Sequence, residues 1–80
     1  MRDEAVRSIL AEHSKLAVDI TTLDNDSDLY DAGLTSLTTV NLMLAIEDHF
    51  DIEFEDDMLS RATFQSVDSL VDAVNRLLEG

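Results

Sequence analysis

The sequence has no cysteine, two glycines and only five basic residues. Without cysteine the chain can form no disulfide bond, thiolate metal site or catalytic thiol, so any thiol chemistry must come from an attached group. Two glycines are too few for a glycine-rich loop that binds phosphate. No apolar run is long enough to span a membrane, and the polar first residues lack the pattern of a signal peptide. We therefore expect a protein of the cytoplasm with no membrane contact.

Acidic residues dominate what is present. Eighteen Asp and Glu residues against five Lys and Arg residues give a formal net charge of −13. Such a field repels nucleic acid and steers the chain toward basic surfaces of other proteins. The acidity would be explained equally well if the negative charge served only to keep the domain soluble. Because like charges repel within the folded chain, its stability should rise with salt.

The hydrophobic pattern predicts one small helical domain, residues 1–80, which we expect to act as a monomer. Apolar residues with helical spacing predict three longer helices and a short one, the third in order, at residues 3–17, 37–50, 56–60 and 67–78. Ile52 and Phe54 alternate with acids, but so short an alternation without a partner strand predicts an extended link with both side chains turned inward. In the short helix that follows, Met58 and Leu59 are expected to pack inward. Ser66 is placed to cap the last helix. The sequence therefore predicts an all-α bundle with a long loop after the first helix.

The first helix and the long loop contain positions expected to face inward. In the helix the apolar stripe comprises Val6, Ile9, Leu10, His13 and Leu16, whereas Arg7 is expected to face solvent. In the loop, residues 17–35, the residues spaced to pack between helices are Val18, Ile20, Leu23, Leu29 and Leu34. A loop of this length is usually functional or held in place. If it crossed the bundle lengthwise, it would join two roughly parallel helices.

The segment around Ser36 has the clearest local signals. Residues 37–50 show one core face, made of Leu42, Met43, Ile46 and Phe50. Gly33 can take a positive φ where the loop turns, and Thr35 or Ser36 can cap the helix. The helix should therefore begin at or beside Ser36. Free amide N–H groups and the positive end of the helix dipole favour an anion there, so a phosphate esterified to Ser36 would be well placed.

A second face of the same helix begins beside Ser36 and is apolar before it becomes acidic. Its residues are Leu37, Val40, Asn41, Leu44, Glu47 and Asp48. They could be additional core, or they could form a docking surface for enzymes that act at Ser36. We favour docking, because one small bundle cannot bury a helix on all sides.

These residues resemble a known family. The motif Gly33-Leu34-Thr35-Ser36-Leu37, followed by Val40 and Ile46-Glu47-Asp48-His49-Phe50, is similar to the modification site and second helix of acyl carrier proteins. The resemblance covers about residues 4–78 and implies a four-helix acyl-carrier-protein-like bundle. It also implies that Ser36 carries 4'-phosphopantetheine, derived from coenzyme A, whose thiol bears acyl or aminoacyl thioesters. The implied partners are a phosphopantetheinyl transferase, a loading ligase and downstream transferases, all with basic patches that dock on the second helix.

One position departs from the family pattern. Thr35 stands where these carriers usually have an aspartate that helps the modifying transferase engage the carrier. With Thr35 at this position and Val40-Asn41-Leu42-Met43-Leu44 after it, the motif resembles that of a narrower group of carriers. That group consists of stand-alone bacterial carriers, which are loaded with an amino acid by a ligase related to aminoacyl-tRNA synthetases.

Two other kinds of site fail on their residue requirements. A serine hydrolase needs Gly-x-Ser-x-Gly or a Ser–His–acid set. Thr38 stands at the second glycine position of the first pattern, and only His13 and His49 are available for the second. Asp24, Asp26 and Asp28 mimic the first ligands of an EF-hand, but the glycine and glutamate that follow in such a loop are missing. We therefore expect no catalytic residue and no metal ligand.

A non-catalytic role leaves two interpretations. As a carrier, the chain would lose its function with Ser36→Ala while keeping its fold. The alternative is an unmodified acidic helical module that docks on basic partner surfaces, for which the same substitution would be neutral.

Overall fold

A computed structural model describes residues 2–14, 16 and 18–79. These residues form helices α1 (Arg2–His13), α2 (Ser36–Phe50), α3 (Arg61–Phe64) and α4 (Val67–Glu79), with two 3-10 turns, η1 (Ile20–Thr22) and η2 (Asp56–Met58). No strand occurs among the described residues. The predicted all-α architecture of three longer helices and a short one is confirmed. None of the helices in the described residues is long and apolar enough to cross a membrane.

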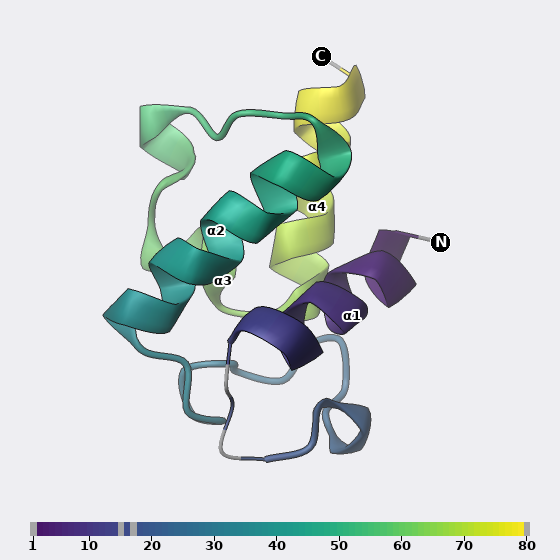
Figure 1. The fold of residues 1–80 in the computed structure, drawn as a ribbon, viewed down its shortest axis with the longest axis vertical. Coiled ribbons are helices and arrows are strands. Elements are labelled where there is room, and N and C mark those ends of the chain that lie inside the picture. The colour runs from purple at the N-terminus through teal and green to yellow at the C-terminus, as the bar shows by residue number, and fades with distance from the viewer. Residues whose placement is uncertain (1, 15, 17, 80) are drawn as a thin grey trace.

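The core forms where α1 packs against both α2 and α4, and α3 closes against α4 (Figure 1). Its buried residues are Val6, Ile9, Leu10, Leu29, Leu34, Leu42, Ile46, Phe54, Met58, Phe64, Val67, Leu70, Ala73 and Val74. Burying one large apolar side chain completely is worth about 1.5–3 kcal/mol. The predicted core face of α2 is confirmed, with Leu42 and Ile46 fully buried and Met43 and Phe50 packed partly buried against the core.

The long loop does not cross the bundle lengthwise (Figure 1), so the condition under which the first two long helices would run parallel is not met. In Figure 1, α1 and α2 run in opposite directions, and the loop between them gathers at one end of the bundle. The residues of the loop form a turn and contacts with the core and α4, and do not span the length of the bundle. The loop makes the turn η1, buries Leu29 in the core, and bonds to the start of α4.

Arg7 holds this loop in place, so the prediction that it faces solvent is wrong. Its guanidinium donates to Asn25 Oδ1 from both Nε (3.0 Å) and Nη2 (2.6 Å). It also donates to the carbonyls of Ile20 (3.0 Å) and Leu23 (2.7 Å). The Asn25 carbonyl in turn accepts from the Asp68 N–H at 2.9 Å, which ties the loop to the first turn of α4.

The end of α1 differs from the prediction. The helix ends at His13, and Ser14 and Leu16 are not helical; residues 15 and 17 lie outside the described residues. The Ser14 N–H makes the last helical bond, to the Leu10 carbonyl, and the buried Ser14 hydroxyl donates to the same carbonyl. This side-chain bond competes with continuing the helix. His13 therefore lies at the exposed end of α1 rather than in its buried stripe.

Two other predictions of burial are wrong, because the segments leave the bundle where these residues occur. Val18 is 45% exposed at the surface of the loop. Leu59 is 47% exposed just after η2, which is only a 3-10 turn where a short helix was predicted, and the short helix α3 lies further along.

The link after α2 follows the prediction and is held by a side chain of α2. Asp51 ends the helix in the left-handed conformation, at φ 55°, and Ile52 and Phe54 then turn inward. Glu47 Oε2 accepts the Phe54 N–H at 2.8 Å, which fixes the link against the helix. Further on, the predicted cap of α4 is confirmed: Ser66 Oγ accepts the Ser69 N–H at 3.1 Å.

Candidate functional site

Thr35 caps α2, which leaves Ser36 as the first helical residue. Thr35 Oγ1 accepts the Thr38 N–H at 3.2 Å, and Thr38 Oγ1 accepts the Thr35 N–H at 2.8 Å. This reciprocal pair is a capping box, with threonine in the place usually held by glutamate or glutamine. In the part of the chain that the structure describes, the Ser36 hydroxyl makes no hydrogen bond. Thr35 thus performs the capping, and the hydroxyl of Ser36 is free to react.

The position of this turn is fixed on both sides by buried residues. Gly33 takes a φ of 115°, which turns the chain so that Leu34 enters the core and its N–H donates to the Leu29 carbonyl at 3.0 Å. On the other side, Leu42 anchors α2 in the core. Ser36 therefore lies exposed at the start of a helix that is held in position by buried residues on both sides.

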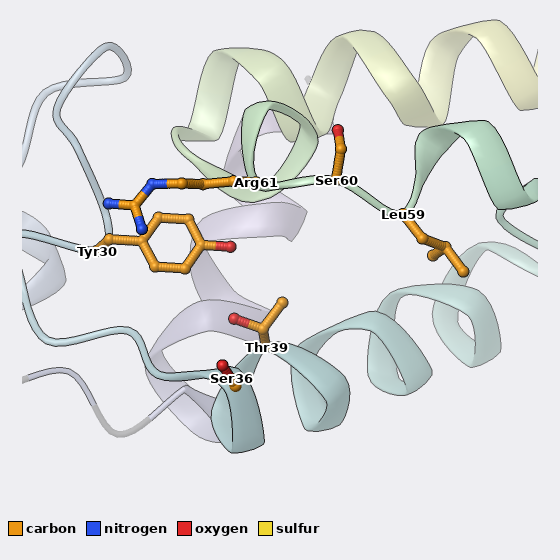
Figure 2. A pocket seen from close by; sticks show the side chains of 6 residues that line it. All are labelled: Tyr30, Ser36, Thr39, Leu59, Ser60 and Arg61. Atoms are coloured by element: carbon orange, nitrogen blue, oxygen red, sulfur yellow. The ribbon is translucent and has the colours of Figure 1, made fainter.

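Ser36 lies on the rim of an open hollow of about 300 Å³. Its lining residues are Tyr30, Ser36, Thr39, Leu59, Ser60 and Arg61, drawn in Figure 2. Only Ser36 among them was identified from the sequence. The others come from the end of the long loop and from the segment after η2, and no local spacing relates those segments to α2. Their rarity was the one signal in the sequence that could have pointed to two of them, since Tyr30 is the only tyrosine of the chain and Arg61 is one of five basic residues.

The residues of the hollow fit a group attached through a phosphate ester. The hollow is lined by the hydroxyls of Ser36, Thr39 and Ser60, and the Arg61 guanidinium supplies a positive charge. The Thr39 hydroxyl donates to the Thr35 carbonyl. That of Ser60 is paired with Thr63, which leaves Ser36, among the described residues, as the unbonded one of the three. The first turn of α2 adds the amide N–H groups and positive dipole end of a 15-residue helix. Leu59 gives the hollow an apolar side. This set of residues suits an anion at the serine with a less polar chain beyond it.

The second face of α2 is exposed where it is apolar. Leu37 is 74% exposed, Leu44 is 54% exposed and Val40 is similar, so the interpretation of these residues as additional core is wrong. Asn41 and Asp48 are exposed beside them. Glu47 is the exception, because it is half-buried and its carboxylate is bonded to the Phe54 N–H. The face therefore consists of an apolar strip that leads away from Ser36, with Asp48 as its free acid.

The aspartates of the long loop serve turns. Asp28 Oδ1 accepts the Tyr30 N–H at 2.9 Å, and the Asp24 N–H donates to Ser27 Oγ at 3.0 Å. In Asp19 the carboxylate accepts from the backbone N–H and the hydroxyl of Thr21, and these bonds lower its pKa. Across the described residues, no three His, Asp or Glu side chains are grouped so that they could hold a metal ion.

Comparison with known proteins gives one family. Residues 4–74 match the family described as "Phosphopantetheine attachment site". The chain is 44% identical, over 75 residues, to the aminoacyl carrier protein of Agrobacterium fabrum (strain C58), an alignment that covers 94% of this chain and 90% of that protein.

Solved structures agree with this result. A carrier protein from Agrobacterium tumefaciens, solved with an engineered Bradyrhizobium japonicum glycine:[carrier protein] ligase and ATP, superposes with a TM-score of 0.91 at 41% identity. That match covers 95% of this chain and 99% of the other. A holo acyl carrier protein from Nitrosomonas europaea matches with a TM-score of 0.87 at 34% identity, over 100% of this chain and 99% of that one.

The family match and the three relatives each cover most of the chain, and they agree with a hollow whose residues suit a phosphate ester. The cofactor of this family is 4'-phosphopantetheine, as the resemblance in sequence implied. The relatives are carriers that other enzymes act upon, not catalysts. The chain belongs to the phosphopantetheine attachment site family and is a carrier protein.

Proposed function

We propose that Ser36 is the residue that carries the phosphopantetheine arm. The observation that supports this most strongly is its position: an exposed first helical residue, with a hydroxyl not used for capping, on the rim of a hollow that suits a phosphate ester. Its oxygen would form a bond to the pantetheine-bearing phosphorus of coenzyme A as the pyrophosphate bond breaks and adenosine 3',5'-bisphosphate leaves. The proton of the hydroxyl passes to a base of the transferase. Once attached, the arm supplies a thiol that holds cargo as a thioester.

The exposed strip of α2 is the proposed docking surface for the enzymes that act on this arm. Leu37, Val40 and Leu44 lead from Ser36 along the exposed side of α2, with Asn41 and Asp48 beside them. An apolar strip with a free acid beside it, on a chain of net charge −13, suits a partner patch of apolar and basic residues. Glu47 belongs to this surface less directly, since its carboxylate is bonded within the carrier. The partners would be a phosphopantetheinyl transferase, a loading ligase and downstream transferases.

The proposed cargo is an amino acid. Two of the three relatives, each matching nearly the full length of the chain, are an aminoacyl carrier protein and a carrier solved with a glycine:[carrier protein] ligase and ATP. The third, an acyl carrier protein, is less similar, at 34% identity. The motif around Thr35 and Ser36 resembles the same group of carriers. A loading partner solved with ATP also supports the cytoplasm as the place of action. Acyl cargo is the competing possibility within the same family.

Loading of the modified protein tests this function. The holo protein is incubated with ATP, a glycine:[carrier protein] ligase and each of several amino acids, and its intact mass is measured. We expect the mass of one aminoacyl group to be added, to be removed by neutral hydroxylamine, and to be absent from Ser36→Ala. Loading by fatty acyl substrates alone would contradict the aminoacyl proposal. A Ser36→Ala variant that kept full activity in its pathway would instead favour the unmodified docking module.

A further inference from the structure

The hollow beside Ser36 has a charged end and an apolar end. Figure 2 shows Tyr30 and Arg61 together at one end and Leu59 at the other, with Ser36 and Thr39 below them. The Arg61 Cζ lies 4.2 Å from the centroid of the Tyr30 ring. The volume, about 300 Å³, compares with sites of roughly 300–1,000 Å³ that bind small molecules. The hollow can therefore take a flexible chain with an anion at one end.

Arg61 is an unusual residue in this position, because the chain as a whole carries a net charge of −13. Other basic side chains are engaged elsewhere: Arg7 with the long loop, and Arg2 with the Asn75 side chain. Within the described part of the chain, no carboxylate lies within 4.0 Å of the Arg61 nitrogens. The guanidinium thus keeps its donors available to a group in the hollow.

Tyr30 holds this guanidinium in place. The backbone of Tyr30 is fixed by the bond from its N–H to Asp28 Oδ1, and its side chain packs partly buried against the core. A guanidinium stacked on an aromatic ring is attracted by the π-face. It also has less rotational freedom to lose when it binds a ligand. The stacked pair is therefore organised before any ligand arrives.

We propose that Arg61, held by Tyr30, binds the phosphodiester that joins the arm to Ser36, so that the arm lies along the hollow toward Leu59. This inference rests on the proposed attachment at Ser36. The planar fork of a guanidinium matches two phosphate oxygens. An exposed pair of this kind shifts the arm toward the hollow by up to about fivefold. So weak a preference shelters the arm between encounters and still releases it to an enzyme.

The test is an NMR comparison of apo and holo protein. In the wild type, attachment of the arm should shift the Arg61 Nε–H signal and the amide signals of Leu59 and Ser60, which lie far from Ser36 in sequence. The ³¹P signal of the phosphodiester should move in Arg61→Gln and less in Arg61→Lys, which keeps the charge without the fork. Tyr30→Phe keeps the ring and should resemble the wild type. Arg76→Gln, on α4, is the control that removes the same charge.

Salt separates an ionic contact from simple packing. In about 1 M salt, where the screening length is about 3 Å, the shift of the Arg61 signal should shrink severalfold. The inference is overturned if a holo protein, complete by mass, shows changes only at residues adjacent to Ser36. It is also overturned if Arg61→Gln moves the ³¹P signal no more than Arg76→Gln does. Both results leave the proposed function standing, whereas absence of any phosphopantetheine on Ser36 overturns both proposals.

Discussion

Arg7 and Asn25, 18 residues apart, are joined by two hydrogen bonds, from Nε and Nη2 of the guanidinium to the same amide oxygen. The same guanidinium donates to two carbonyls of the loop. The backbone carbonyl of Asn25 in turn accepts the Asp68 N–H, which bonds the loop to α4. One side chain of α1 thus orders the loop that ends in Gly33 and Ser36. The loop that leads to Ser36, the proposed attachment residue, is therefore tied to both α1 and α4.

Removing the Arg7 guanidinium should destabilise the fold. Arg7→Ala is expected to lower the free energy of unfolding by about 1.5–3 kcal/mol, the range for hydrogen bonds made by charged groups. Arg7→Lys should recover only part of this, because an ammonium cannot reproduce the planar fork. Urea unfolding at fixed salt measures both. Arg76→Ala removes the same charge from an exposed site, and a loss equal to that of Arg7→Ala would contradict the account.

Glu47 should be important for stability, unlike its neighbour in the predicted docking face. Glu47→Ala leaves the Phe54 N–H without its acceptor and should lower the free energy of unfolding by about 1–3 kcal/mol. Asp48→Ala, at an exposed position, should change it by less than about 0.5 kcal/mol. Thermal unfolding of the two variants side by side checks the difference. Equal losses would mean that the bond to Phe54 contributes nothing.

The exposed strip of α2 should affect partner binding and leave the fold unchanged. Leu44→Ala is expected to weaken binding of the loading ligase or the transferase by about tenfold, as for a residue near the centre of an interface. Its effect on the melting temperature should be small because the side chain is half exposed. The matched control is Leu78→Ala, because Leu78 is also exposed but lies on α4, away from the strip. Calorimetry that gave the same affinity for both variants would exclude this surface.

Salt should act in opposite directions on folding and on docking. Because the chain carries a net charge of −13, screening reduces repulsion within it, so its melting temperature should rise as salt is added. The affinity for a basic partner should fall over the same range, mainly through slower association. Scanning calorimetry and stopped-flow binding at matched ionic strengths test the two signs. Affinity that did not change with salt would contradict the charge complementarity proposed for α2.

The sequence predicted most of what depends on neighbouring residues. The start of α2, its core residues Leu42 and Ile46, and the cap at Ser66 all follow from signals within a few positions. The same local reasoning left open whether Thr35 or Ser36 caps α2. The structure assigns the cap to Thr35, because the Thr38 side chain completes a reciprocal pair that an isolated cap would lack.

What the sequence could not predict depends on contacts between distant segments. Arg7 has the spacing of a solvent-facing residue on α1, and only the folded loop shows what it binds. Leu59 looked like a packing residue, but the turn at η2 directs it outward, into the hollow beside Ser36. Tyr30 and Arg61 come from opposite sides of α2 in sequence, and the fold brings them together. No periodicity within one segment contains this information.

The central claim, that Ser36 carries the arm, is tested most directly by locating the modification. Ser60 lines the same hollow and is the competing hydroxyl. The protein is incubated with coenzyme A and a broad-specificity phosphopantetheinyl transferase and then digested at its acidic residues. Cleavage before Asp31 and after Glu47 isolates Ser36 from Ser60. We predict one phosphopantetheine on the peptide that contains Ser36, unchanged in Ser60→Ala and absent from a folded Ser36→Ala. Modification that persisted in Ser36→Ala, or that mapped to Ser60, would contradict the account.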